Sequence, residues 1–408
     1  MSAPVAGRPT TDRLLAHARG ALPRFLTELS HLVGVDSGSY NADGVNRVGD
    51  WLESRMRCLD FAVERLPGGT LTSGRRAGDI LVARRAGSLP QIDGGRRILL
   101  AGHMDTVFDD GTAADRPFSV RGSRAYGPGV SDDKGGLLAG VHAIEALDAA
   151  GCDRYAELIF MATPDEEIGS PTSREVTEAA AASADCALAL ECARENGDLV
   201  IARKGVTDLR IAITGRAAHA GIEPERGAHA ALAAAHLVVA LQGLNGKLPD
   251  ISVNVGVLQA GSRPNIVPAE ADLHVEIRST STKALRACHQ AVAEMAAVPA
   301  VAGTRAAVTV TDMCPPMEDS PAARRLADAA LRLGAELGLR LGAAATGGVG
   351  DANIIAGTGT PVLDGLGPVG GGDHSCDEWL EISSAPERVA LLAALIAELG
   401  DTRALSRR

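Results

Sequence analysis

Five short segments of this 408-residue chain place side chains that bind metals beside apolar runs. These side chains are two imidazoles and a set of carboxylates, and they belong to His103 and Asp105 in "LLAGHMDTV", Asp132 and Asp133 in "YGPGVSDDKGG", Glu166 and Glu167 in "ATPDEEIGS", Glu191 after "CALAL", and His374 in "GPVGGGDHSCDE". Adjacent carboxylates at the end of a buried strand repel each other and lose hydration. Cations nearby would offset both effects, so the pattern favours a centre for two divalent ions bridged by one aspartate.

Four of these segments also have an ordinary interpretation. An isolated His-x-Asp is commonly a solvated loop pair, "DEE" is commonly an acidic turn, and a single His near glycines is commonly a loop residue. "SDDKGG" is a frequent helix start, where acidic side chains cap the backbone and suit the helix dipole. What favours the metal centre is that all five segments lie at strand-to-loop junctions. On an extended strand, residues two apart such as His103 and Asp105 also face the same side.

The elements that must position these residues alternate between strand and helix. Helical spacing covers most of residues 10–60, and the apolar runs "DILVARR", "RILLAGHMD", "ELIFMATPD" and "CALALECA" are typical of strands. The run "KGGLLAGVHAIEALDAAG" between the second and third strands predicts a helix. This order predicts an α/β fold with a mixed, largely parallel sheet flanked by helices.

From about residue 206 the pattern changes to alternating apolar and polar positions, as in "VTDLRIAITG" and "AEADLHVEIRST". Four such half-buried strands and two helical runs predict a compact α+β domain. The α/β pattern returns after residue 317. We therefore expect a main domain formed by residues 1–205 and 315–408, with a second domain inserted at 206–314.

Composition excludes several classes of function. The net charge of −11 argues against a nucleic-acid partner, because phosphate binding needs clustered Lys and Arg. Seven scattered cysteines without CxxC spacing are typical of reduced thiols. The chain shows neither a signal-like apolar run nor an uncharged span of about 20 apolar residues. We expect a cytoplasmic protein without a membrane partner.

The motifs "GHMDTV", "GPGVSDDKGG", "PDEEIGS", "GRAAHAG", "PNIVPAEADLHVEIR" and "GGGDHSCDE", in this order, resemble those of the M20 family of di-zinc peptidases and amidohydrolases. The resemblance spans roughly residues 30–400 and is nearest to the carboxypeptidase G2 (glutamate carboxypeptidase) branch. It implies two Zn²⁺ per chain, for which Co²⁺ or Mn²⁺ could substitute. His103 and Glu191 would bind one ion, Glu167 and His374 the other, and Asp132 would bridge them.

The resemblance also implies the roles of neighbouring residues. Glu166 would be the general base, Asp105 would orient the ring of His103, and the peptide bond between Asp132 and Asp133 would be cis. In this scheme one residue of the glutamate pair binds metal and the other moves protons.

The inserted domain resembles the lid of this family, which usually also forms a homodimer. His219 matches a lid histidine that reaches a substrate carbonyl in the neighbouring active site of dimeric relatives, and Asn265 and Arg278 match substrate contacts. Arg278 would pair with a free carboxylate, and Gly347 and Gly348 resemble a substrate-lining loop. Alternatively, His219 is an ordinary turn residue and Arg278 makes an ordinary salt bridge.

The expected substrate is a small peptide or N-acyl amino acid with a free α-carboxylate. Strict glutamate specificity is not expected. Glutamate-releasing members have basic or hydroxyl residues that bind the glutamate side chain where this chain has Ile201, Met313 and Cys314. Arg203 or Lys204 could substitute for those basic or hydroxyl residues. Two alternatives stay open. One is a deacylase of the acetylornithine deacetylase or succinyl-diaminopimelate desuccinylase type, and the other is a metal-free binding or scaffold protein on the same fold.

Overall fold

The computed structural model describes residues 9–401, which form two compact units. The first unit contains the residues up to Ile201, Asp319–Thr346 and the segment from Gly350 onward. The second contains Ala202–Glu318 together with Gly347–Val349.

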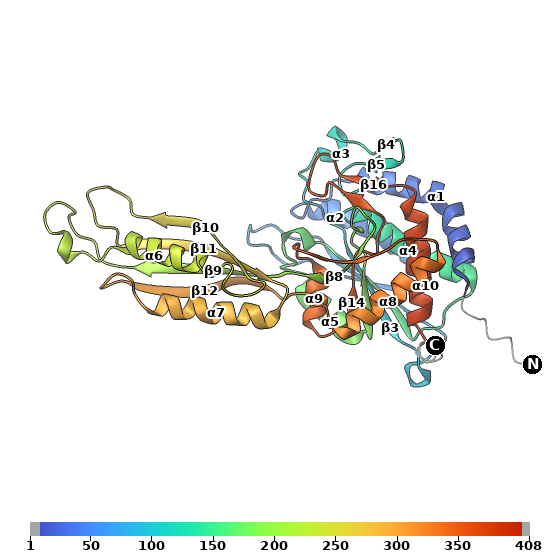
Figure 1. The fold of residues 1–408 in the computed structure, drawn as a ribbon. Coiled ribbons are helices and arrows are strands. Elements are labelled where there is room, and N and C mark those ends of the chain that lie inside the picture. The colour runs from blue at the N-terminus through green and yellow to red at the C-terminus, as the bar shows by residue number, and fades with distance from the viewer. Residues whose placement is uncertain (1–8, 402–408) are drawn as a thin grey trace, which may run out of the picture. The chain divides into compact units, whose positions relative to one another are not determined.

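The first unit is built on a six-stranded mixed sheet (Figure 1). In the order β1-β2-β6-β3-β7-β14 its strands are Ala62–Leu66, Ile80–Ala86, Glu157–Thr163, Arg97–His103, Cys186–Ala189 and Val362–Leu363. Strands β6, β3, β7 and β14 pair in parallel, whereas β1 and β2 add an antiparallel edge. Strands β3 and β6 are buried beyond their first residue, which is why their sequences are continuous apolar runs.

Helices cover this sheet in two groups. One group consists of α1 (Thr11–Val33), α4 (Lys134–Ala150) and α10 (Ser384–Leu399), which pack against one another. The other consists of α5 (Arg174–Ser183) and α9 (Asp351–Gly357), which contact each other and β3. Of the remaining helices, α2 (Ala42–Cys58) packs on β1 and β2, α8 (Pro321–Glu336) packs on β14 and α10, and α3 (Thr112–Asp115) is a single turn.

Two small sheets complete the first unit. One has the order β15-β16-β5-β4, with strands Gly370–Gly371, Trp379–Glu381, Arg124–Tyr126 and Ser119–Arg121. In the other, β8 (Leu199–Arg203), which begins in the first unit and ends in the second, pairs with β13 (Ala343–Thr346). The sequence patterns did not predict the first of these sheets, because its strands are only two or three residues long.

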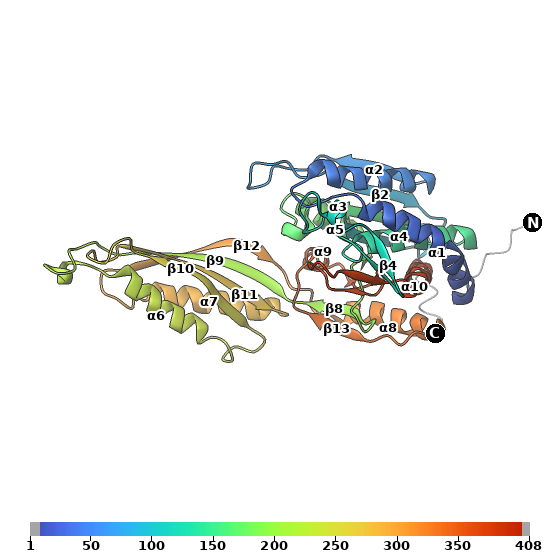
Figure 2. The ribbon, with the colours of Figure 1, turned by 90° about the horizontal axis from the view of Figure 1, so that it is seen from above.

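The second unit is a four-stranded antiparallel sheet with two helices on one face (Figure 2). The strand order is β10-β11-β9-β12, formed by Ser252–Ala260, Glu270–Ser279, Gly205–Thr214 and Arg305–Cys314. The helices are α6 (Ala230–Gln242) and α7 (Thr282–Ala297). Burial alternates along β9 and β11, so every second side chain packs under the helices. The predicted fold class, an α/β sheet domain with a four-strand, two-helix α+β insertion, is confirmed.

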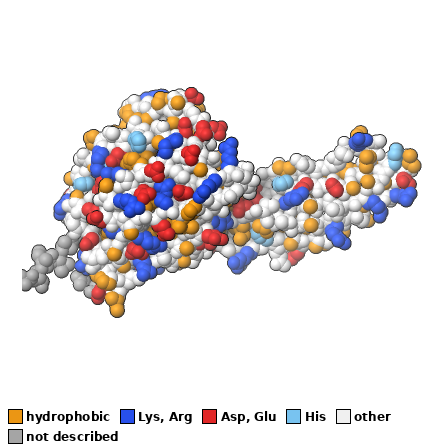
Figure 3. All heavy atoms as spheres, turned by 180° about the vertical axis from the view of Figure 1, so that it is seen from behind, with side chains coloured by type: hydrophobic (Ala, Val, Ile, Leu, Met, Phe, Trp, Pro, Cys, Tyr) orange, Lys and Arg blue, Asp and Glu red, His pale blue; other side chains and the backbone are white. Residues whose placement is uncertain are grey.

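The surface of the first unit carries charged side chains of both signs. On the face shown in Figure 3, acidic and basic side chains are interspersed over the first unit and form no continuous basic field. Helices formed by residues 9–401 include none with an apolar stretch long enough to span a bilayer. All seven cysteines lie within the described residues as free thiols.

Candidate metal centre and substrate-binding residues

The parallel strands bring the acidic segments to one edge of the sheet. Strand β3 ends at His103, and its neighbours β6 and β7 end shortly before Glu166 and Glu191. Because parallel strands point the same way, the loops that follow them meet at the carboxyl edge. Residues separated by up to 88 positions in the sequence thus meet at one place.

Five predicted ligands converge there in two groups that share Asp132. In the first group, Nε2 of His103 lies 2.9 Å from Oδ1 of Asp132 and 3.8 Å from Oε1 of Glu191. In the second, Nε2 of His374 lies 3.3 Å from Oδ2 of Asp132 and 3.1 Å from Oε2 of Glu167. Asp132 therefore presents one carboxylate oxygen to each group, which is the arrangement that a bridging ligand requires.

The segment that carries Asp132 leads into α4 through a tight backbone. The peptide bond between Asp132 and Asp133 is cis, as the family resemblance implied. The Asp133 carboxylate lies against β3 and α4, where a Cβ atom at Gly102 or Gly136 would stand 2.4 or 2.0 Å from its oxygens. Glycine at these two positions makes room for that buried carboxylate.

Asp105 holds the loop with the two glutamates. It is fully buried, and its carboxylate accepts the backbone N–H groups of Glu166 and Glu167, each at 3.1 Å, and the hydroxyl of Ser39 at 2.7 Å. Nδ1 of His103 lies 3.0 Å from the Asp105 carbonyl oxygen and 3.4 Å from Oδ1. Asp105 thus contacts the His103 ring, and it also fixes the backbone of the glutamate pair, which the sequence had not indicated.

A second buried aspartate, missed from the sequence, supports the same loop from α9. Asp351 accepts hydrogen bonds of 2.6 Å from the hydroxyls of Thr163 and Ser170, which flank the glutamate pair. It is 5% exposed. Its position within "GGVGDANII", between glycines and an apolar run, was the available signal, because an acidic residue is seldom buried there without a partner.

Glu378, also missed, anchors the Asp132 segment. Its buried carboxylate accepts the backbone N–H groups of Gly129, Ser131 and Asp132 at 2.8–3.1 Å, as well as the Ser131 hydroxyl at 3.2 Å. Glu378 lies four residues after His374 in the segment between β15 and β16. The Glu378 side chain therefore links the loop that carries His374 to the loop that carries Asp132.

The electrostatics of the site call for positive charge. Burial raises the pKa of Glu166 well above its usual value, and nearby carboxylates, among them Glu191 and Glu167, raise it further. Burial likewise raises the pKa of Glu167, although its hydrogen bond with His374 opposes this. Hydrogen bonds to Asp132 and Glu167 raise the pKa of His374 to about 10. The carboxylates and imidazoles of the site therefore tend to hold protons. Bound cations would offset the same repulsion between the carboxylates.

The donor set fits divalent ions. Oε1 of Glu167 is buried without a hydrogen-bond partner among the described residues, and a buried carboxylate oxygen needs a proton donor or a cation. Imidazole nitrogens and carboxylate oxygens are ligand types that zinc accepts. Glu166 belongs to neither group of ligands, and within residues 9–401 its carboxylate makes no hydrogen bond.

The substrate-binding candidates lie in the second unit and separate into two sets. His219 and Asn265 lie in loops joined by the backbone, since Ala220 N–H donates to the Asn265 carbonyl at 3.0 Å. His219 is exposed, and Nδ1 accepts the N–H of Gly221 at 3.1 Å. Both loops adjoin the end of the sheet where Thr214 pairs with Glu270.

Arg278 lies at the other end of β11. Its guanidinium pairs with Glu276 at 2.8 and 3.0 Å and donates to the Gly347 carbonyl at 3.0 Å, so the structure brings it to the glycine loop that includes Gly348. Eight residues of antiparallel strand separate Glu270 from Arg278, or about 27 Å at ~3.4 Å per residue. His219 and Arg278 of one chain are therefore too far apart to hold one small ligand between them.

Comparison with known proteins agrees with this fold. Residues 99–398 match the model of "Peptidase family M20/M25/M40". Carboxypeptidase G2 from Pseudomonas sp. (strain RS-16) is 33% identical over 381 residues, which cover 93% of this chain and 90% of that protein.

Solved structures resemble the fold over almost their whole length. Aminopeptidase PepT from Bacillus cereus superposes with a TM-score of 0.73 at 24% identity, covering 93% of this chain and 98% of that one. Human carnosine dipeptidase 1 does so with a TM-score of 0.66 at 15% identity, covering 97% and 100%.

The family match and the carboxypeptidase relative define the class of protein as a hydrolase that acts on peptide bonds. Within that class, the chain belongs to peptidase family M20/M25/M40.

Replacing Glu378 should loosen the Asp132 segment. In the Glu378→Gln variant an amide NH₂ would face backbone N–H donors, so we expect a loss of about 1–3 kcal/mol in the free energy of unfolding, measured by urea denaturation. The control is Glu381→Gln on β16, whose partners are the hydroxyls of the exposed Ser123 and Ser383 and, at 3.8 Å, the half-exposed guanidinium of Arg124. Equal stability of the two variants would contradict the anchoring role.

Proposed function

We propose that the chain is a two-zinc hydrolase that cleaves an amide or peptide bond next to a free carboxylate. The observation that carries the proposal is the pair of ligand groups sharing Asp132. His103 and Glu191 would hold one ion, His374 and Glu167 the other, and Asp132 both. Ions bound there would polarise the substrate carbonyl and lower the pKa of an adjacent water.

Glu166 is the proposed general base. It is anchored through its backbone to Asp105 while its carboxylate is left without a hydrogen-bond partner among the described residues, so it can accept and release a proton. In the reaction its carboxylate takes the proton of the attacking water and passes it to the leaving amine nitrogen. The raised pKa of Glu166 indicates that its proton affinity depends on the charge around it.

His219 is proposed to act in the active site of a partner chain. It is exposed, and the length of β11 separates it from Arg278. Donation from its ring to the substrate oxygen would stabilise the negative charge that develops during attack. This role supports a homodimer formed through the 206–314 domain, which would act as the lid.

Arg278 is proposed to bind the substrate carboxylate with its planar fork. Glu276 occupies that fork in the free chain, so the substrate carboxylate must displace the Glu276 carboxylate.

We propose a substrate class of peptides or N-acyl amino acids rather than glutamate conjugates alone. Met313 is half-exposed and Cys314 is buried, and neither can bind a side-chain carboxylate.

Removing the proposed base should separate catalysis from metal binding. We expect Glu166→Ala to lower kcat by about 10²–10⁴-fold while metal content per chain is unchanged, because Glu166 belongs to neither ligand group. Elemental analysis and turnover of a dipeptide panel measure the two effects. Glu167→Ala is the matched control and should lose metal. Loss of metal from the Glu166 variant would refute the assignment.

We call the proposed pairing of Arg278 with the substrate carboxylate the carboxylate clamp. It can be tested by changing either member of the ion pair between Arg278 and Glu276. Arg278→Ala should lower kcat/KM by about 10–100-fold for an N-acyl amino acid but not for its C-terminal amide, since charge-assisted hydrogen bonds contribute about 1.5–3 kcal/mol. Glu276→Gln frees the fork and should lower KM for the acid. Equal effects of Arg278→Ala on acid and amide would remove the clamp.

Action of His219 across a dimer predicts complementation between inactive variants. Mixing His219→Ala with Glu166→Ala chains, after dissociation and reassociation, should restore about a quarter of wild-type activity, because half the dimers are mixed and each has one intact site. Each variant mixed with itself is the control. If His219 acts within its own chain, the mixture stays inactive.

A further inference from the structure

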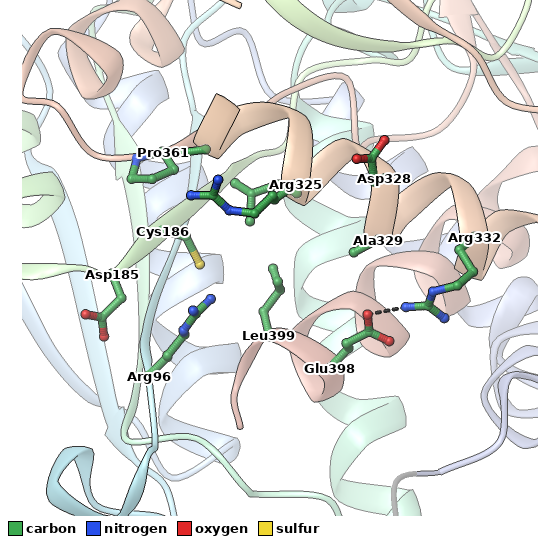
Figure 4. A pocket seen from close by; sticks show the side chains of 12 residues that line it. Arg96, Asp185, Cys186, Arg325, Asp328, Ala329, Arg332, Pro361, Glu398 and Leu399 are labelled. Carbon is green, nitrogen blue, oxygen red and sulfur yellow. Dashed lines mark hydrogen bonds and ion pairs between the residues drawn. The ribbon is translucent and has the colours of Figure 1, made fainter. Parts of the chain in front are cut away.

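A cavity of about 640 Å³ lies at the edge of the main sheet opposite the candidate metal centre (Figure 4). It opens where Arg96 precedes β3, where β7 begins at Cys186, and where Pro361 precedes β14. Helix α8 and the end of α10 form its other walls. Volumes of 300–1,000 Å³ are typical of sites for small molecules.

The inner wall of the cavity is apolar. Leu326 and Ala329 from α8, Leu399 from α10 and the Cys186 side chain are all nearly buried. Burial raises the pKa of the Cys186 thiol to about 12, so the sulfur stays protonated and contributes apolar surface rather than a nucleophile.

The acidic groups around the cavity are engaged or turned away. Asp185 accepts the backbone N–H of Arg97 at 2.7 Å, and Glu398 is paired with Arg332. In Figure 4 the carboxylate of Asp328 points out of the cavity. Within residues 9–401 these acids form no group with the geometry of a metal site.

The guanidinium groups of Arg96 and Arg325 also line the cavity. Arg96 and Arg325 make no hydrogen bond or ion pair with side chains of the described residues, and Figure 4 shows both pointing toward the space in front of Cys186 from opposite walls. Arg96 is fixed by its backbone, because its N–H donates to the Gly400 carbonyl at 2.9 Å. Two guanidinium groups that have no such side-chain partner within the described residues, beside a cavity with an apolar inner wall, suit an anion with an apolar body.

We propose that this cavity binds a small organic carboxylate, held by the forks of Arg96 and Arg325, with its apolar part against Leu326, Ala329 and Leu399. The site lies at the start of β3, whereas His103 ends that strand, about 20 Å away at ~3.3 Å per residue. Binding here therefore needs neither the proposed metal ions nor the second unit.

Calorimetric titration of the full chain with hexanoate tests the site. We expect saturable binding that the Arg96→Gln/Arg325→Gln double variant weakens by about tenfold or more. Arg324→Gln is the matched control on α8, because Arg324 pairs with Asp319 and does not line the cavity. If the double variant does not fold, the two single variants serve, each with an expected loss of about threefold.

Two further probes and a crystal structure define the chemistry. Hexylamine should not bind, and inorganic phosphate should bind more weakly than hexanoate because it lacks an apolar body. Hexanoate should appear in crystals between Arg96 and Arg325. Absence of saturable binding, unchanged affinity in the double variant, phosphate binding as tight as hexanoate, or hexanoate found only beside Asp132 would each overturn the proposal.

Discussion

The main physical constraint on the candidate site is the electrostatic repulsion among the carboxylates gathered around Asp132. Asp132, Asp133, Glu166, Glu167 and Glu191 converge at the edge of a sheet whose central strands β3, β6 and β7 are almost wholly buried. In low-dielectric surroundings such a group keeps its charge only if cations lie within a few ångströms. The two imidazoles, drawn from distant segments, supply part of that charge as protons, and the proposed ions would supply it in the working enzyme.

A hydrogen-bonded frame holds this repelling group in place. Asp105 binds the backbone of the glutamate pair, Asp351 binds the two hydroxyls beside it, and Glu378 binds the backbone of the Asp132 segment. Each of these carboxylates accepts several donors, which explains how acids can be buried so close to other acids. The frame fixes the positions of the candidate ligands without an ion, so metal binding would require little further ordering of the chain.

The sequence predicted what depends on local pattern and missed what depends on contact. The main strands, both helices of the second unit and the segments carrying His103, Asp132, Glu167, Glu191 and His374 are readable because apolar periodicity and residue type reveal them. The frame residues Asp351 and Glu378 are not, since their partners are backbone N–H groups and hydroxyls far away in the chain. The length of β11 that separates His219 from Arg278 likewise emerges only from strand register.

The count and position of metal ions test the central claim most directly. Anomalous diffraction at the zinc edge, from crystals of the full chain grown with zinc, should show two ions per chain, one on each side of the Asp132 carboxylate. A single ion, or ions that contact His103 or His374 but not Asp132, would contradict the account.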